Sequence, residues 1–193
     1  MPKIILAKAE KIIPSSVPAD LYITRNMPGI RKQQYLLGRG LIRAQVSGYL
    51  NCQPNQLAIE PTGKPMVTEP SFAHVSLAHS NNFFLCGVSE QKIGVDLEYI
   101  KRKSNMIAVA NRFYHKSELA WLKNDNQLAL KLWVAKEACI KCDNVTIAGN
   151  LANYVFDSNF NLLSSDLTIQ FWQVSDYMIA CASNEKAELD FLI

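Results

Sequence analysis

The segment LWVAKEACIKC carries an aromatic ring, a carboxylate and an ammonium at intervals of four residues: Trp133, Glu137 and Lys141. The segment has no Gly or Pro and is rich in helix formers, so it is predicted to be a helix that carries all three on one face. There the carboxylate could hold a metal ion or accept a proton, and the ammonium could neutralise a phosphate oxygen. A second interpretation is a solvated Glu137–Lys141 ion pair beside a Trp133 that packs in the core.

Two further carboxylates, Asp96 and Glu98, lie in the segment IGVDLEY. Its apolar residues predict a strand, and alternation along a strand puts both acids on one face. Neighbouring like charges repel, so something must compensate for them. One candidate is a divalent cation, because Mg²⁺ takes one or two carboxylates together with phosphate oxygens. The other is solvent, at an edge strand beside the basic run of residues 101–103.

The N-terminal third should supply a helix and the first strands. Strands are predicted at Ile4–Leu6 and Leu21–Thr24, followed by a helix with a broad apolar stripe from Arg31 to Leu50. Opposite the stripe, Lys32, Arg39 and Arg43 share a face. We expect this basic face to be solvated, and an anion site is the alternative.

The middle of the chain should bring a lysine and a small sheet towards the acids. Residues 51–71 are rich in loop-forming residues, and a turn at Pro61-Thr62-Gly63-Lys64-Pro65 would present Lys64 between two rigid flanks. Strands are predicted at Phe72–Leu77, Phe83–Ser89 and Lys92–Ile100, separated by polar turns at residues 78–82 and 90–91.

The second half repeats the order of the first. Residues 104–142 are predicted to be helical, with N-terminal caps at Ser104-Asn105, Ser117 and Asp125-Asn126. Strands follow at Tyr154–Phe156, Phe160–Leu163, Leu167–Val174 and Tyr177–Ala182. Each half thus runs from helix to strands and ends in a similar apolar strand, at residues 81–89 and 175–183. We therefore expect an α+β fold of two similar lobes, residues 1–92 and 93–193, each a small, mostly antiparallel sheet with a packed long helix.

Composition narrows the class of protein. The 193 residues are 49% hydrophobic and 19% charged, which is ordinary for a globular protein. A net charge of +3 suits an anionic ligand or an acidic partner and is too small to indicate nucleic acid. The odd number of scattered cysteines indicates a reducing compartment, and no signal-peptide or membrane-spanning pattern is present. We expect a cytoplasmic protein.

Taken in order, the motifs resemble those of the 4′-phosphopantetheinyl transferase superfamily, and within it the small two-lobed enzymes of the Sfp/AcpT-like group. The order is Gly63-Lys64-Pro65, then His79-Ser80, then GVDLE at residues 94–98 and WVAKEACIK at residues 133–141. The last two match the family patterns G-[IV]-D-[IVL]-E and W-x-x-K-E-[AS]-x-x-K. The segment RFYHKSELAWL between them is also similar, and the resemblance covers roughly residues 31–183.

This resemblance implies a reaction and its participants. The phosphopantetheine arm of coenzyme A would pass to a serine of an apo carrier protein, with release of adenosine 3′,5′-bisphosphate, on a magnesium-dependent monomer. An acidic recognition helix of the carrier would suit the basic side chains of Lys101, Arg102, Lys103 and Arg112.

The resemblance also implies roles for single residues. Asp96, Glu98 and Glu137 would bind magnesium, and Glu137 would also deprotonate the serine. Phosphate or coenzyme contacts would come from Lys141, His79 and Lys64, with the basic residues Arg31, Lys32 and Arg43 as further candidates.

The chain departs from the family pattern at one motif. Where the family commonly reads N-[IVL]-S-H-S, this chain reads Ser76-Leu77-Ala78-His79-Ser80, so the Asn and the first Ser are replaced. His79 is kept. The loss of a hydroxyl beside the nucleotide leaves a non-catalytic coenzyme A-binding protein of the same fold as the alternative to an enzyme.

Overall fold

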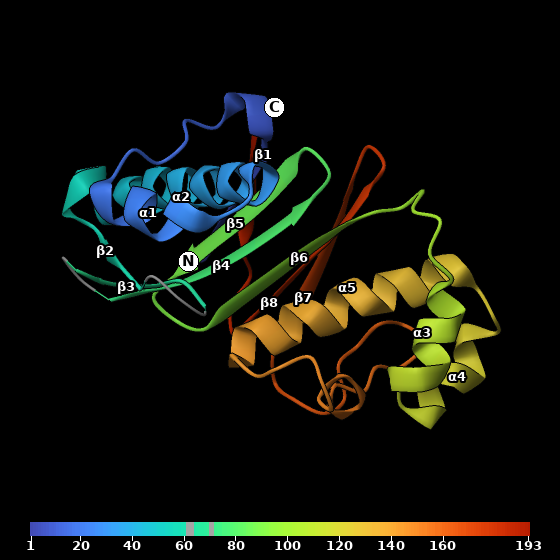
Figure 1. The fold of residues 1–193 in the computed structure, drawn as a ribbon. Coiled ribbons are helices and arrows are strands. Elements are labelled where there is room, and N and C mark those ends of the chain that lie inside the picture. Colours follow the sequence, from blue (N-terminus) through green and yellow to red (C-terminus); the bar gives the residue numbers. More distant parts are fainter. Residues whose placement is uncertain (61–63, 70–71) are drawn as a thin grey trace.

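The computed structural model describes residues 1–60, 64–69 and 72–193. Its N-terminal part is a six-stranded sheet in the order β2-β3-β4-β5-β1-β9, antiparallel except where β9 runs parallel to β1. The strands are β1 (Lys3–Lys8), β2 (Ala58–Ile59), β3 (Met66–Glu69), β4 (Ala73–Ser80), β5 (Phe83–Ser89) and β9 (Glu188–Leu192). The long helix α2 (Gly29–Leu50) and the short helix α1 (Pro18–Ile23) lie beside this sheet (Figure 1).

A second, three-stranded antiparallel sheet forms the C-terminal part. Its order is β6-β8-β7, with β6 at Ile93–Tyr99, β7 at Thr168–Val174 and β8 at Tyr177–Ser183. The long helix α5 (Asn126–Asp143) packs on β6 and β8, and the shorter helices α3 (Met106–Phe113) and α4 (Lys116–Leu122) lie near its N-terminal end (Figure 1). Asp125 caps the N-terminus of α5, because its carboxylate accepts the N–H groups of Gln127 and Leu128.

The two parts share one topology, as the repeated apolar strands predict. In the first, β1 pairs antiparallel with β5, and β5 pairs with β4. In the second, β6 pairs antiparallel with β8, and β8 pairs with β7. A long helix, α2 or α5, follows the first strand of each set. The predicted α+β class with two similar, mainly antiparallel units is therefore confirmed.

The boundary between the lobes is less simple than a cut after residue 92. β9 returns to the N-terminal sheet and pairs with β1, so the last strand of the chain completes the first sheet. One apolar cluster also lies between the two sheets. It is built from both halves of the chain and includes Ile4, Leu6, Leu85, Val95, Leu97, Ile179 and Cys181. Each lobe also has an apolar cluster of its own. Because burial of the shared surface stabilises both lobes together, the cluster between the sheets joins them.

Several elements differ from the sequence predictions. Residues 21–24 belong to α1 and a following 3-10 turn, and the predicted strand there is wrong. Pro18 occupies the first helical position, where its fixed φ favours a helix. The predicted strands at residues 154–156 and 160–163 are also wrong, because this stretch forms only an isolated bridge between Phe156 and Leu162.

Packing explains the irregular stretch. Tyr154 and Phe156 are buried in the cluster around α5, and the N–H of Phe156 donates to the carboxylate of Glu118, so it takes no part in a ladder. The first predicted polar turn is shorter than expected, since residues 78–80 continue β4 and put His79 on a strand. The cap of α4 is His115, whose Nδ1 accepts the N–H of Ser117, and the predicted Ser117 cap is wrong.

Candidate active site

Lys141, Glu137 and Asp96 meet where α5 crosses β6. The Lys141 Nζ lies 2.6 Å from Asp96 Oδ1 and 3.8 Å from Glu137 Oε2. Asp96 is only 5% exposed, and the side chains of Glu137 and Lys141 are 13% and 28% exposed. The cluster is therefore largely buried, and the interpretation of Glu137 and Lys141 as a solvated pair is wrong. The one-turn spacing along α5 and the alternation along β6 place these residues together as predicted.

Gly94 allows α5 to come this close to β6. A Cβ atom at residue 94 would lie 1.9 Å from the carbonyl oxygen of Ala138 and 2.4 Å from the backbone nitrogen of Cys142. These distances are far shorter than any non-bonded contact, so only glycine fits there. The glycine of the GVDLE motif therefore sets the separation between the strand that carries Asp96 and the helix that carries Glu137.

Glu98 lies on the same face of β6 as Asp96 and has its own partners. Its Oε1 lies 2.5 Å from the Arg102 guanidinium, and the Ser80 hydroxyl lies 3.4 Å from its Oε2. Val95 and Leu97, on the other face of the strand, belong to the cluster between the sheets. The alternation predicted for β6 is thus confirmed.

Burial and like charge shift the pKa values in this cluster. Burial raises the pKa of Glu137 to about 7, with Asp96 and Glu98 adding to the effect and Lys141 opposing it. Burial also raises the pKa of Asp96, although the Lys141 ammonium favours its ionised form. Burial lowers the pKa of Lys141, but the attraction of Asp96, Glu137 and Glu98 outweighs it and the net shift is upward. Burial thus favours the protonated form of both carboxyls, and the Lys141 ammonium opposes it.

The acids suit a hard divalent cation. The Oδ2 atom of Asp96 is buried and has no hydrogen-bond partner in the part of the chain that the structure describes, which leaves a carboxylate oxygen available inside the cluster. Oxygen donors of this kind are the ligands that Mg²⁺ prefers. In the described residues no group of three or more His, Cys, Asp or Glu side chains is already arranged to hold a metal ion. The ammonium of Lys141 stands between Asp96 and Glu137 instead, and bonds to one and lies near the other.

Lys64 connects the N-terminal part to this cluster. Its Nζ donates to the backbone carbonyls of Lys141, at the end of α5, and of Ile93, where the second distance is 3.3 Å. Desolvation lowers its pKa. The predicted turn around Lys64 includes residues 61–63, which lie outside the described residues. The structure therefore brings Lys64 to the site, bound to backbone rather than projecting into solvent.

A pocket of about 320 Å³ opens beside Lys64 and Lys141. It is lined by residues of both parts of the fold: Lys64, Pro65, Ser76, Leu77, Glu137, Ile140, Lys141, Asn144, Val145 and Ile147. A second pocket of about 280 Å³ shares Pro65 and Leu77 with it and is lined also by Arg31, Tyr35 and Arg39. Polar and cationic groups along an apolar trough suit an elongated ligand with phosphate groups.

His79 lies near the cluster on the exposed end of β4. Its ring packs on Phe84, with ring centroids 5.4 Å apart. Desolvation lowers its pKa, and the charge of Lys141 lowers it further, while Glu98 opposes the shift. His79 is thus within electrostatic range of both Lys141 and Glu98.

Arg43 is not brought to the site. Arg39 and Arg43 are each only 6% exposed, so the prediction of a solvated basic face is wrong for both. The Arg43 Nε lies 3.0 Å from Asp20 Oδ2, and its Nη1 donates to the carbonyls of Pro54 and Leu57. These bonds satisfy its guanidinium within the N-terminal lobe, and the sequence pattern of α2 gave no sign that Asp20 would face it.

Sequence reasoning also missed a second lysine of the WVAKEACIK motif. Lys136 is fully buried, 2.8 Å from the equally buried Glu118, and its Nζ also donates to the carbonyls of Leu151 and Tyr154. Its place between the buried residues Leu132 and Cys139 on the helix could have indicated this. Trp133 packs against the same cluster, in agreement with a packing role.

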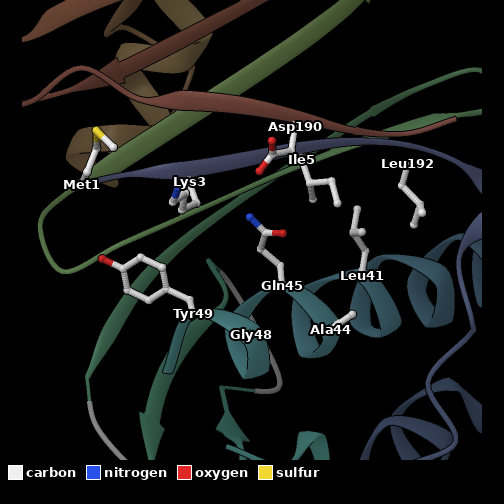
Figure 2. Close-up of a pocket in the computed structure, with 10 residues that line it drawn as sticks. All are labelled: Met1, Lys3, Ile5, Leu41, Ala44, Gln45, Gly48, Tyr49, Asp190 and Leu192. Carbon is white, nitrogen blue, oxygen red and sulfur yellow. The ribbon is translucent and has the colours of Figure 1, made fainter. Parts of the chain in front are cut away.

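Another groove, of about 570 Å³, lies away from the cluster. It runs between α2 and the strands β1 and β9, and Figure 2 shows Gln45 and Tyr49 of α2 facing Lys3 and Asp190 across it. None of the predicted site residues lines it.

Comparison with known proteins indicates a family. Residues 92–182 match the family model of the 4′-phosphopantetheinyl transferase superfamily. The chain is 33% identical over 129 residues to the 4′-phosphopantetheinyl transferase HetI of Nostoc. The aligned residues cover 61% of this chain and 54% of HetI. It is 31% identical to Sfp of Bacillus subtilis over 55% of this chain and 50% of Sfp. It is 26% identical to AcpT of Salmonella typhi over 73% of each chain.

The segment that carries β6, α5 and the acidic cluster is therefore similar to the 4′-phosphopantetheinyl transferase superfamily. The resemblance seen in the sequence motifs is confirmed. The chain spans little more than half the length of HetI and half that of Sfp.

Proposed function

We propose that this protein transfers the 4′-phosphopantetheine group of coenzyme A to a serine of an apo acyl or peptidyl carrier protein. The products are the holo carrier protein and adenosine 3′,5′-bisphosphate, and the reaction depends on magnesium. The observation that supports this most directly is the buried cluster of Asp96, Glu137 and Lys141 at the mouth of a pocket that Lys64 also lines. Relatives named 4′-phosphopantetheinyl transferases support the same reaction.

Glu137 is suited to accept the proton of the carrier serine. Its pKa, raised by burial to about 7, lies near the pH of a cell, where a general base is both available and strong enough to take a proton. Lys141, whose pKa is raised, stays protonated and can stabilise the negative charge that develops on the phosphate oxygens during transfer. Asp96, Glu98 and Glu137 would hold the metal, which supplies positive charge to the pyrophosphate.

The coenzyme would lie along the two adjoining pockets. Lys64 and His79 border the site from the N-terminal part and can contact phosphate groups. Arg31 and Arg39 line the second pocket, and the Nη1 atom of Arg39 is buried with no hydrogen-bond partner among the described residues. A phosphate or ring nitrogen of the coenzyme would satisfy that atom. We assign Arg43 no coenzyme contact, because Asp20 and two carbonyls occupy its guanidinium.

The carrier protein would approach from the basic side of β6. Lys101 and Arg102 pair with Asp176 and Glu98, while Lys103 and Arg112 are exposed and better placed to meet an acidic helix. We further propose that the protein acts as a monomer in the cytoplasm and does not bind nucleic acid. Its free cysteines fit the reducing conditions of the cytoplasm. In the described residues no helix has the length and apolar character to cross a bilayer.

The test is the intact mass of an apo acyl carrier protein after incubation with this protein, coenzyme A and Mg²⁺. A gain of one phosphopantetheine group that chelator abolishes is the expected result. Asp96→Ala and Glu137→Ala should each remove most of the turnover while the thermal unfolding profile stays cooperative. No gain with several carrier types, although coenzyme A still binds, would show a non-catalytic binding protein, and near-normal activity in either variant would overturn the site assignment.

A further inference from the structure

The strands β4 and β6 meet through serine side chains. The Val95 N–H donates to the Ser76 hydroxyl at 3.0 Å, and the Tyr99 N–H donates to the Ser80 hydroxyl at 3.3 Å. The spacing is four residues on both strands, so the two strands run in the same direction along this contact. We call this line of contacts, from Ser76 to Ser80 and from Val95 to Tyr99, the seam.

The seam contains no backbone ladder in the described structure. β4 belongs to the six-stranded sheet and β6 to the three-stranded one, although the two lie side by side (Figure 1). A buried N–H group needs a partner, and here the serine hydroxyls supply what a neighbouring strand would otherwise supply. Ser76 is only 2% exposed, so water is a poor substitute for its hydroxyl.

The seam brackets the acids of the site. Val95 and Tyr99 stand directly before Asp96 and directly after Glu98. The Ser80 hydroxyl, which accepts the N–H of Tyr99, also lies 3.4 Å from Glu98 Oε2 and can donate its own hydrogen to that carboxylate. One hydroxyl thus fixes both the backbone and the side chain at the end of the acidic segment.

We propose that Ser76 and Ser80 are positioning residues that hold β6, and with it Asp96 and Glu98, in register against Glu137 and Lys141 of α5. This role rests on the proposed metal-binding function of the acids. It is a matter of geometry, because ligands that are held less firmly bind a metal more weakly.

The role also accounts for the altered motif. Ser76 stands where the family pattern has Asn, and Ala78 where it has Ser. Ala78 packs with Leu97 in the cluster between the sheets, and the hydroxyls on either side of it, at residues 76 and 80, both reach β6. The SLAHS sequence therefore keeps two hydroxyls on the face of β4 that forms the seam.

The seam itself can be tested by hydrogen exchange of the Val95 and Tyr99 amides. In Ser76→Ala the Val95 amide should exchange about fivefold faster, and in Ser80→Ala the Tyr99 amide should do so, since a hydrogen bond contributes about 1 kcal/mol. Ser80→Thr retains a hydroxyl and should restore protection. Ser47→Ala is the matched control, because Ser47 is a buried serine that, among the described residues, donates to the Arg43 carbonyl of its own helix and makes no contact with the seam. Unchanged exchange at both amides would overturn the seam.

The positioning role is tested by the affinity of the substrate-free protein for Mn²⁺. Electron paramagnetic resonance of the unbound ion measures this affinity. Ser80→Ala should weaken Mn²⁺ binding about tenfold, as loss of a group that orients a metal ligand does, and Ser80→Thr should recover it. The KM for coenzyme A should change little. Faster amide exchange with unaltered Mn²⁺ affinity would overturn the positioning role. A wild-type protein that binds no Mn²⁺, or binds it equally well after Asp96→Ala, would overturn the proposed metal site instead. Hydrogen exchange of the Val95 and Tyr99 amides would still test the seam in that case.

Discussion

The ammonium of Lys141 lies 2.6 Å from the buried carboxylate of Asp96 and holds a negative charge that water does not reach. Removal of one partner from a buried ion pair leaves the other charge unpaired and typically costs about 3–5 kcal/mol. We therefore expect Lys141→Met to lower the free energy of unfolding by a few kcal/mol, on the order of that range. The loss should be largest in metal-free protein near pH 8, where the acids are most ionised.

Urea unfolding of Lys141→Met with and without Mg²⁺ measures this effect. Added Mg²⁺ should recover part of the loss, because a cation bound by the acids replaces the missing ammonium. Lys141→Arg keeps the charge and serves as the control. Equal stability of Lys141→Met and the wild-type protein at pH 8 would show that the ion pair does not stabilise the fold.

The raised pKa of Glu137 predicts how stability changes with pH. In the folded protein this carboxyl keeps its proton up to a pKa of about 7, whereas in the unfolded chain it loses the proton near its ordinary value of 4.5. Between these values the folded state binds more protons, so this group makes the metal-free protein less stable as pH rises from 4.5 to 7. The burial of Asp96 acts in the same direction.

Thermal unfolding of the wild-type protein and Glu137→Gln at pH 5 and pH 8 tests this prediction. The variant removes the carboxyl that must ionise, so without metal it should be more stable than the wild-type protein at pH 8 and close to it at pH 5. Mg²⁺ should stabilise the wild-type protein more at pH 8, since metal binding needs the ionised acids. Glu10→Gln, at an exposed position, is the control. A difference that is the same at both pH values would contradict the assigned pKa.

Local sequence patterns predicted which side chains share a face, and the resemblance of the motifs to the family brought the two faces into one candidate site. Helical spacing in α5 and alternation in β6 determine which way Glu137, Lys141, Asp96 and Glu98 point, and both depend only on neighbours in the chain. The close approach of α5 to β6 requires the glycine at residue 94, and the reason becomes visible only in the structure, where the Ala138 carbonyl lies over it.

Contacts between distant segments could not be predicted in this way. Arg43 is buried because Asp20, from another helix, faces it, and no periodicity in α2 encodes that partner. β9 has mostly exposed side chains, so it lacks the alternation of a half-buried strand and is held by its backbone pairing with β1. The strands predicted within residues 154–163 do not form. Tyr154 and Phe156 are buried because they pack around α5, and not because they belong to a sheet.

Replacement of Gly94 and of Gly48 by alanine gives a matched pair of variants. Gly94→Ala should prevent stable folding or lower stability by more than about 3 kcal/mol, since the new methyl would overlap backbone atoms that cannot move independently. Gly48 lies in the last turn of α2, and a methyl group added there would meet no neighbouring atom within 4 Å. Gly48→Ala should therefore stabilise the protein by about 0.5–1 kcal/mol through helix propensity. Urea unfolding of the two variants measures both effects, and a mild effect of Gly94→Ala would refute the close packing of α5 on β6.

The buried pair of Lys136 and Glu118 is expected to hold α5 in place without taking part in the reaction. Lys136 sits on the face of α5 away from Asp96, and Glu118 also accepts the N–H groups of His115 and Phe156. Lys136→Met should cost about 3–5 kcal/mol of stability, because it leaves the Glu118 carboxylate buried without its cation.

A double variant separates the charge from the packing. In Lys136→Met/Glu118→Gln the uncompensated charge is gone, and stability should recover by about 1–3 kcal/mol relative to Lys136→Met, since a neutral amide is less costly to bury. Urea unfolding gives these values. Turnover by the fraction of Lys136→Met that remains folded at low temperature should stay close to wild type, in contrast to Glu137→Ala. A folded Lys136→Met protein without activity would place Lys136 in the reaction itself.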